Sequence, residues 1–242
     1  MRLVAGNWKM NGTSDLAREL AAGLAERVAA SAPACSVVIC PPAPLLGLAQ
    51  ASAAGRVALG GQDCSDEAGP GAFTGEVSAR MLADAGCGYV IVGHSERRQR
   101  HGEESALVQA KAARALEAGL VPIICVGETL AQREAGQAVE VVSTQVRESL
   151  PEAAAAQTVV LAYEPVWAIG SGLTATLADI AEIHRAVGAV LGPIRARTAI
   201  LYGGSVKPAN AREILTTEGV DGALVGGASL KLDDFWGIVA AA

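Results

Sequence analysis

Short runs of β-branched and other apolar residues recur along the chain, and segments with helical spacing of apolar and charged residues separate them. The runs are nearly continuous in their apolar character, which is typical of strands buried on both faces of a parallel sheet. The pattern predicts strands at residues 2–7, 36–40, 57–62, 89–94, 121–126, 158–164, 199–202 and 223–225.

The segments between these runs predict helices. An alanine-rich helix is expected at 14–30, and helix formers with charges at helical spacing predict helices at 103–118, 130–150 and 178–191. Eight strand–helix units in 242 residues, with no linker between them, favour one closed (β/α)8 barrel as a single domain over residues 1–242. A doubly wound open sheet is the alternative α/β architecture.

Composition and charge indicate what the core consists of and which class of binding partner is not expected. Apolar residues make up 51% of the chain and aromatic residues only 3%, so the core must consist mainly of Ala, Val, Leu and Ile. The formal charge is −6, and no basic run is longer than Arg97-Arg98. Nucleic acid is therefore not expected as a partner, and an anionic ligand would need a local binding site.

Targeting and cysteine patterns suggest a cytoplasmic protein. No N-terminal segment resembles a signal peptide, and the longest apolar runs are far shorter than a membrane span, so no membrane contact is expected. The five cysteines show no CxxC spacing, and their odd number indicates free thiols in a reducing compartment. We expect them to be small buried apolar residues.

Polar residues and glycines gather where the predicted strands end. In a (β/α)8 barrel the carboxyl ends of the strands form one rim, and that rim carries the chemistry. The candidates there are Asn7 and Lys9 after the first strand, His94 after the fourth, Glu164 after the sixth, Gly203-Gly204-Ser205 after the seventh and Gly226-Gly227 after the eighth.

The segment from Tyr163 to Leu173 is the most informative. Glu164 lies where a strand ends, Pro165 stiffens the junction, and Gly170-Ser171-Gly172 follows an apolar stretch. Thr174 or Thr176 then offers a cap for the next helix. The segment reads as a carboxylate base joined to a closing lid.

The glycine pairs of the last two loops suggest phosphate binding. Without Cβ atoms, backbone amides at 204–205 and 226–227 can approach an anion closely, and Ala228-Ser229-Leu230 can begin a short helix. Each pair alone could also be an ordinary tight turn. Lys9 lies between Trp8 and Met10 directly after a strand, which favours a cation facing the site over a solvated surface charge.

His94 precedes an expected helix start, with Ser95 as the cap and Glu96 in the first turn. Positive potential at that helix start should keep His94 neutral, as a hydrogen-bond donor and proton shuttle. We interpret His101 and His184 as surface residues. The pair Arg97-Arg98 is expected to form supporting salt bridges.

Several of these segments resemble the triosephosphate isomerase family. The resemblance runs along essentially the whole chain, and its motifs are specific in their order and context. They are Ala5-Gly6-Asn7-Trp8-Lys9-Met10-Asn11-Gly12, Gly71-Ala72-Phe73-Thr74-Gly75-Glu76, Gly93-His94-Ser95-Glu96-Arg97-Arg98, Ala162-Tyr163-Glu164-Pro165-Val166-Trp167-Ala168-Ile169-Gly170 and Tyr202-Gly203-Gly204-Ser205-Val206.

The resemblance implies a TIM barrel that interconverts dihydroxyacetone phosphate and D-glyceraldehyde 3-phosphate in glycolysis and gluconeogenesis, without a metal or organic cofactor. Glu164 would be the general base, neutral His94 would polarise the carbonyl, and Asn7 and Lys9 would stabilise the enediolate. Further roles are implied for phosphate-binding Gly170, Ser171, Ser205, Gly226 and Gly227, for Glu96 beside Lys9, and for Cys125 near Glu164.

The resemblance also implies a homodimer formed through the loop around Gln62–Glu76, which would carry Thr74 towards Asn7 and Lys9 of the neighbouring subunit. The chain departs from the family pattern at three positions, which are Ser171 for a common Thr, Leu173 for a frequent Lys and Asp63 for a frequent Asn. Ser171 and Leu173 bear on how fast the lid opens and closes, and Asp63 bears on the strength of the dimer interface.

Three other functions are weighed against an isomerase of triose phosphates. A related isomerase for a longer sugar phosphate would need a roomier site. A non-catalytic phosphate-binding barrel would have no use for a carboxylate base such as Glu164. A metal-dependent epimerase is disfavoured because the three histidines form no evident ligand cluster.

Overall fold

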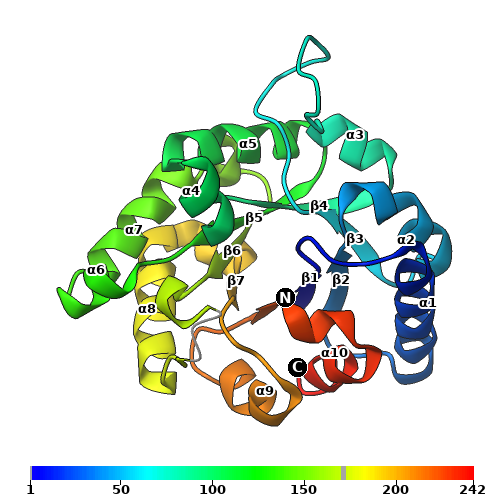
Figure 1. Cartoon of the computed structure of the whole chain (residues 1–242). Helices are drawn as coiled ribbons and strands as arrows, with labels where there is room; N and C mark the ends of the chain where they lie inside the picture. Colours follow the sequence, from blue (N-terminus) through cyan, green and yellow to red (C-terminus); the bar gives the residue numbers. More distant parts are fainter. Residues whose placement is uncertain (1, 170–172) are drawn as a thin grey trace.

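The strands form a closed barrel at the centre of the molecule, and helices surround it (Figure 1). The computed structural model describes residues 2–169 and 173–242. Neighbouring strands are parallel and follow one another in sequence order, and β8 closes the barrel against β1. The (β/α)8 prediction is therefore confirmed, and the alternative of an open doubly wound sheet is wrong. The strands are β1 Leu3–Asn7, β2 Ser36–Cys40, β3 Ala58–Gly61, β4 Cys87–Val92, β5 Val121–Val126, β6 Val160–Tyr163, β7 Ala199–Tyr202 and β8 Gly222–Val225.

The helices occupy the outer layer, as the apolar and charged periodicity predicts. The α-helices of the described residues are α1 Ser14–Ser31, α2 Leu46–Ala53, α3 Ala79–Asp84, α4 Ser95–His101, α5 Ser105–Glu117, α6 Leu130–Glu134, α7 Ala138–Ser149, α8 Leu177–Leu191, α9 Pro208–Leu215 and α10 Leu232–Val239. Short 3-10 turns are η1 Ala43–Leu45, η2 Glu152–Ala155, η3 Val166–Ala168, η4 Gly192–Arg197 and η5 Gly227–Leu230.

Two expected boundaries differ in the structure. The helix expected over 130–150 is interrupted between α6 and α7, because Gly136 adopts a left-handed conformation with φ of 72°. The fourth strand begins at Cys87 and ends at Val92, two residues earlier than expected at each end, so His94 lies beyond it. Of the two threonines offered as a cap, Thr176 caps α8.

Side chains alternate between the interior of the barrel and the layer under the helices. Along β1, Leu3 and Ala5 belong to the interior cluster, whereas Val4 packs with the outer one. Along β6, Val160 and Ala162 are likewise interior. Because successive inward positions are two residues apart, Asn7 and Glu164 continue these inward series to the carboxyl-terminal rim.

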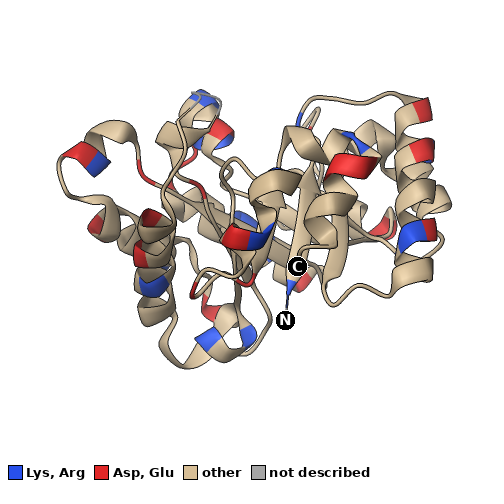
Figure 2. Ribbon diagram, turned by 90° about the horizontal axis from the view of Figure 1, so that it is seen from below, with Lys and Arg blue, Asp and Glu red and all other residues tan. Residues whose placement is uncertain are grey.

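The loop between β3 and α3 projects away from the body of the barrel (Figure 1). Lys and Arg positions are interspersed with Asp and Glu over the elements visible in Figure 2. Among the described residues, no helix is long and apolar enough to cross a membrane. All five cysteines are buried and free, as expected.

Candidate active site

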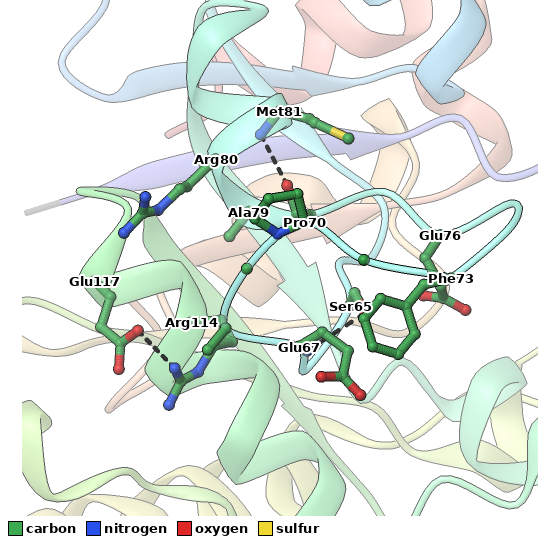
Figure 3. A pocket seen from close by; sticks show the side chains of 14 residues that line it. Ser65, Glu67, Pro70, Phe73, Glu76, Ala79, Arg80, Met81, Arg114 and Glu117 are labelled. Atoms are coloured by element: carbon green, nitrogen blue, oxygen red, sulfur yellow. Dashed lines mark hydrogen bonds and ion pairs between the residues drawn. The ribbon is translucent and has the colours of Figure 1, made fainter.

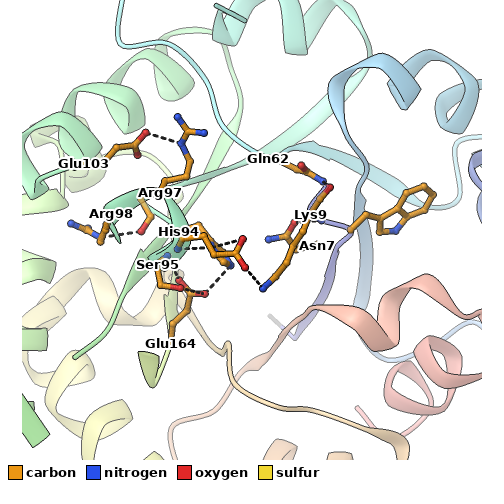
Figure 4. Close-up of polar contacts among 12 residues, drawn as sticks. Asn7, Lys9, Gln62, His94, Ser95, Arg97, Arg98, Glu103 and Glu164 are labelled. Atoms are coloured by element: carbon orange, nitrogen blue, oxygen red, sulfur yellow. Dashed lines mark hydrogen bonds and ion pairs between the residues drawn. The ribbon is translucent and has the colours of Figure 1, made fainter. Parts of the chain in front are cut away.

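Glu164 lies directly after β6 and is buried against the start of α4 (Figure 4). Its carboxylate accepts hydrogen bonds from the Ser95 backbone N–H at 2.9 Å and from the Ser95 hydroxyl at 3.3 Å. The carboxylate also contacts His94, whose Nε2 atom lies 2.9 Å from Oε1 of Glu164. The carboxylate is thus held by defined donors at the rim of the barrel.

Two glycines make room for Glu164. A Cβ atom on Gly127 would lie 1.8 Å from the Glu164 carbonyl oxygen, a separation that the backbone cannot tolerate. A Cβ atom on Gly203 would lie 2.9 Å from Cγ of Glu164. Gly203, which we read from sequence as part of a phosphate loop, is therefore also required for packing of the carboxylate side chain.

His94 forms the N-cap of α4, so the prediction that Ser95 is the cap was wrong; Ser95 is the first residue of the helix. Nδ1 of His94 accepts a hydrogen bond from the Glu96 backbone N–H at 3.2 Å. Because an acceptor nitrogen carries no proton, this bond assigns the proton of the neutral ring to Nε2, which faces Glu164.

The protonation of His94 and Glu164 is coupled. Burial is the largest influence on the pKa of His94 and lowers it, but the charge and hydrogen bond of Glu164 outweigh burial, and the pKa lies above its usual value. Burial also raises the pKa of Glu164, but His94, the Ser95 N–H and Lys9 together bring it below its usual value. The charge of Glu164 therefore opposes the effect expected from the helix start, and the neutral state of His94 stays a prediction.

Lys9 adopts a strained backbone conformation with φ of 52°, which is uncommon for a residue other than glycine. Its N–H donates to Oδ1 of Asn7 at 2.9 Å, and its carbonyl accepts from Nε2 of Gln62 at 2.8 Å. The Nζ atom of Lys9 lies 2.6 Å from Oε1 of Glu96. These contacts fix the ammonium group beside His94 and Glu164.

The polar side chains and the glycine loops line one cavity of about 430 Å³. A Cβ atom on Gly226 would lie 3.6 Å from Cε of Lys9, so this loop lies directly beside the ammonium group. The predicted site residues that the cavity brings together are Asn7, Lys9, His94, Glu96, Glu164, Ser205, Gly226 and Gly227. Predicted Gly170 and Ser171 lie outside the described residues.

Cys125, predicted near Glu164, is fully buried on β5. Burial raises the pKa of its thiol well above the usual value, and the charge and hydrogen bond of the Glu164 carboxylate raise it further. The thiol therefore stays protonated next to the carboxylate. This environment fits a packing partner and does not fit a nucleophile.

Arg97 and Arg98 have different surroundings, so the expectation for this pair is only half correct. Arg97 forms salt bridges with Asp63 at 2.9 Å and Glu103 at 2.7 Å. Arg98 instead donates to the carbonyl oxygens of Gly93 at 3.0 Å and Cys125 at 3.2 Å. Arg98 therefore ties β4 to β5 beneath the site through backbone contacts.

Asp63 belongs to a network of partly and fully buried charges. Nζ of Lys111 lies 2.8 Å from Asp63 and 2.6 Å from Glu103, and Arg97 contacts both carboxylates. Burial raises the pKa of Asp63, and the two cations oppose that shift. Asp63 carries a negative charge where the family frequently has a neutral Asn, and Arg97 and Lys111 of the same subunit balance this charge.

His184 lies in the core, so the interpretation of it as a surface residue is wrong. It is 1% exposed, and its Nδ1 lies 3.1 Å from the Gly219 carbonyl oxygen. The ring packs edge-on to Tyr163 with centroids 6.0 Å apart. His101 is exposed, as expected. Within residues 2–169 and 173–242, no group of three or more His, Cys, Asp or Glu side chains is arranged to hold a metal ion.

Sequence reasoning missed several contributors to the site. Ser95 holds the Glu164 carboxylate with two donors, and its position in a helix-start motif was interpreted only as a cap. Ile169 and Lys207 also line the cavity. Lys207 lies two residues beyond the predicted Gly203-Gly204-Ser205 loop, and this closeness in sequence could have indicated that it lines the cavity.

Comparisons with known proteins agree along the whole chain. A family model described as triosephosphate isomerase matches residues 2–242. A triosephosphate isomerase from Afipia carboxidovorans is 55% identical, over 99% of this chain and 96% of the relative. One from Caulobacter vibrioides is also 55% identical, with the same coverage of both chains. A crystal structure of triosephosphate isomerase from Bartonella henselae has a TM-score of 0.87 at 43% identity, and covers 99% of this chain and 98% of that one.

Proposed function

The chain belongs to the triosephosphate isomerase family, and from that premise we propose that the rim cavity carries out the reaction of the family with Glu164 as its base. The reaction is the interconversion of dihydroxyacetone phosphate and D-glyceraldehyde 3-phosphate, a step of glycolysis and gluconeogenesis. The observation that supports this assignment best is the meeting of Glu164, His94 and Lys9 in one cavity with two glycine loops.

Glu164 would remove the carbon-bound proton next to the substrate carbonyl. Its lowered pKa keeps it a carboxylate, which is the form a base requires. In the present arrangement both of its oxygens are engaged by Ser95 and His94. The side chain must therefore turn from these donors towards the cavity before it acts, and the bound substrate would supply the favourable contacts.

Turning of Glu164 would also prepare His94. The Glu164 carboxylate raises the pKa of the imidazole most, with a smaller contribution from the charge of Glu96, so its departure would remove most of that influence. Burial, the charge of Lys9 and the Glu96 N–H at Nδ1 all favour the neutral ring. The Nε2–H group then becomes a free donor. It would polarise the substrate carbonyl and move protons between the two substrate oxygens.

Lys9 and Asn7 would stabilise the negative charge that develops on the enediolate. General-base catalysis contributes about 10² to 10⁴ in rate, which is too little by itself for deprotonation of carbon. An ammonium group held in place by Glu96 beside the cavity would supply electrostatic stabilisation without reorganisation during the reaction. The strained backbone at Lys9 is consistent with such preorganisation.

The phosphate would bind at the glycine side of the cavity. Gly226, Gly227 and Ser205 line that side of the cavity, and Gly226 lies beside Lys9. Their backbone amides and the Ser205 hydroxyl would supply the donors to the phosphate. Gly170 and Ser171 are proposed as further contacts from the lid. Binding energy from this non-reacting group would then draw the lid over the reacting carbon and exclude water.

A homodimer through the projecting loop is a further part of the proposal. The loop walls a cavity of about 380 Å³ together with α3 and α5 (Figure 3), and apolar Phe73 is 42% exposed beside it. A second cavity of about 560 Å³ adjoins Asn7 and Lys9 and includes Met10, which is 95% exposed. We propose that it receives Thr74 of the partner subunit, and sedimentation of the purified protein would test the dimer.

We also infer that residues 1–242 act as one catalytic domain in the cytoplasm. The closed barrel uses strands from both ends of the chain, since β1 pairs with β8. The five buried free thiols suit a reducing compartment. Fractionation of cells that produce the protein would test the location.

A coupled isomerase assay in the presence of a chelator tests the proposed function. We expect turnover of D-glyceraldehyde 3-phosphate that the chelator leaves unchanged. The same assay with a four-carbon sugar phosphate separates this enzyme from an isomerase for longer substrates, and a preference for the four-carbon compound would refute the triose assignment. Absence of turnover would favour a phosphate-binding barrel without catalysis.

A further inference from the structure

The guanidinium of Arg98, on α4, is held by four neutral acceptors. Its Nε donates to the Gly93 carbonyl oxygen at 3.0 Å, and its Nη2 donates to the Cys125 carbonyl oxygen at 3.2 Å. The hydroxyls of Ser105 on α5 and Ser149 on α7 accept further bonds, at 3.3 Å and 3.1 Å. The side chain thus joins the turn after β4 to the end of β5 and to two helices.

Arg98 differs from the cation beside it in sequence. Within residues 2–169 and 173–242 it forms no salt bridge, whereas Arg97 pairs with two carboxylates. Burial lowers the pKa of Arg98, and the Cys125 thiol and the Glu164 carboxylate oppose this shift. Because no ion pair offsets the desolvation of the guanidinium, its charge is a poor source of fold stability. Its bonds to backbone carbonyl oxygens are the feature that explains its position.

The turn that Arg98 binds carries two groups of the site. Gly93 adopts φ of 66° directly after β4, His94 is the N-cap and Ser95 begins α4. Figure 4 shows Arg98 on the side of His94 and Ser95 away from Lys9. The Arg98 backbone N–H donates to the His94 carbonyl oxygen at 3.1 Å, and a Cβ atom on Gly93 would lie 3.2 Å from Nη2 of Arg98. Arg98 therefore holds this turn with its backbone and with its side chain.

The end of β5 holds the backbone of Glu164. Strand pairing of β4 with β5 stops one residue before Gly93 and Cys125. Beyond that point the Cys125 carbonyl oxygen accepts the bond from Arg98, and the next carbonyl oxygen, that of Val126, accepts the Glu164 N–H at 2.8 Å. The guanidinium thus continues the connection between the two elements at the place where Glu164 is attached.

We propose that Arg98 is a positioning residue, whose side chain fixes the turn that carries His94 and Ser95 to the end of β5 and so sets the distance of these two donors from Glu164. The inference rests on the proposed function, in which Glu164 turns from these donors and His94 polarises the substrate carbonyl. Arg98 acts through this spacing, because it is not among the described residues that line the cavity.

The chemistry of arginine suits this connection. A guanidinium presents its donors in a fixed planar fork, so Nε and Nη2 can bind two carbonyl oxygens at a set separation. An ammonium group is a single centre on a flexible stem and cannot hold both carbonyl groups in that geometry. A glutamine side chain ends near the place of Nε, so it can reach Gly93 but not Cys125.

Arg98→Met removes both bonds and keeps an unbranched stem. We expect kcat for D-glyceraldehyde 3-phosphate to fall by about 10-fold to 100-fold, because a small displacement of His94 from the reacting atoms is costly. Affinity for glycerol 3-phosphate, which has the phosphate but no carbonyl for His94 to polarise, should change by less than about twofold. A purely structural role would lower the unfolding midpoint without separating kcat from binding.

Two further variants separate geometry from charge. Arg98→Lys keeps the charge but not the fork, and it should lose about tenfold in kcat. Arg98→Gln can still donate to the Gly93 carbonyl oxygen but loses the connection to Cys125, and a loss of similar size is expected. These two variants decide the matter if Arg98→Met does not fold.

Arg197→Met is the matched control. Arg197 also donates to backbone carbonyl oxygens, those of Ala154 and Ala155 in η2. It lies just before β7, at the amino-terminal end of the barrel, whereas the site lies at the carboxyl-terminal rim. Its loss should leave kcat and the affinity for glycerol 3-phosphate unchanged.

A kcat of Arg98→Met equal to that of the unmodified chain would overturn the positioning role. Full activity of Arg98→Lys would overturn it too, because charge alone would then suffice, and so would parallel losses of kcat and of glycerol 3-phosphate affinity. Failure of the proposed function is distinguishable, because the unmodified chain would then show no turnover of D-glyceraldehyde 3-phosphate.

Discussion

The buried imidazole of His184 should make folding stability depend on pH. The ring is 1% exposed, its Nε2 has no hydrogen-bond partner within the described residues, and burial lowers its pKa from 6.5 to about 4. In the unfolded chain the ring takes up a proton below pH 6.5, whereas in the folded chain it does so only near pH 4. The unfolded state thus binds more protons in this range, so stability falls as the pH is lowered from 6.5 to 4.

The size of this effect follows from the two pKa values. Each pKa unit corresponds to about 1.4 kcal/mol, so the full displacement is worth about 3 kcal/mol below pH 4. Between pH 8 and pH 5 the contribution of His184 to the free energy of unfolding should change by about 2 kcal/mol. Above pH 7 it should be flat.

Urea denaturation followed by circular dichroism at fixed protein concentration, from pH 4 to pH 8, would measure this dependence. Other groups titrate in the same range, so the comparison must be made with His184→Asn, whose amide can still donate to the Gly219 carbonyl oxygen. The variant should lose about 2 kcal/mol less than the unmodified chain between pH 8 and pH 5. Identical pH dependence in the two proteins would refute the reasoning.

Two further substitutions test the site more locally. Lys9→Ala should weaken binding of a phosphate-bearing ligand such as glycerol 3-phosphate by about 10-fold to 100-fold, as expected for loss of a charged contact. Unchanged affinity in titration calorimetry would remove Lys9 from the site. Gly127→Ala should destabilise the fold by about 3 kcal/mol, because its Cβ would lie 1.8 Å from the Glu164 carbonyl oxygen. Gly88→Ala, whose Cβ would meet nothing within 4 Å, is the control, and similar unfolding midpoints for the two variants would contradict the packing argument.

The barrel and the location of the site were predictable because both depend on short-range periodicity. Apolar runs with helical segments between them fix the order of the elements, and parallel strands bring their carboxyl ends to one rim. Asn7 and Glu164 could therefore be placed together although they are far apart along the chain.

Contacts between side chains from different elements were less predictable. The pKa of His94 depends on how Glu164 is turned, and the balance around Asp63 depends on Lys111 from α5. Neither of these dependences can be inferred from the local sequence pattern, because each involves residues from different elements. The burial of His184 could have been foreseen, because it falls within the apolar stripe of α8 that includes Ile180 and Val187.

In the proposed function, Glu164 removes a proton from carbon. The most direct test is to measure steady-state isomerase kinetics of Glu164→Gln and Glu164→Asp. Binding of glycerol 3-phosphate, which has the phosphate but no carbonyl, is measured in the same variants. Glutamine cannot accept the proton, so kcat should fall by about 10² to 10⁴, whereas aspartate withdraws the carboxylate by one methylene and should lose much of kcat. Affinity for glycerol 3-phosphate should change little in both. Turnover of Glu164→Gln equal to that of the unmodified chain, with binding intact, would contradict the account.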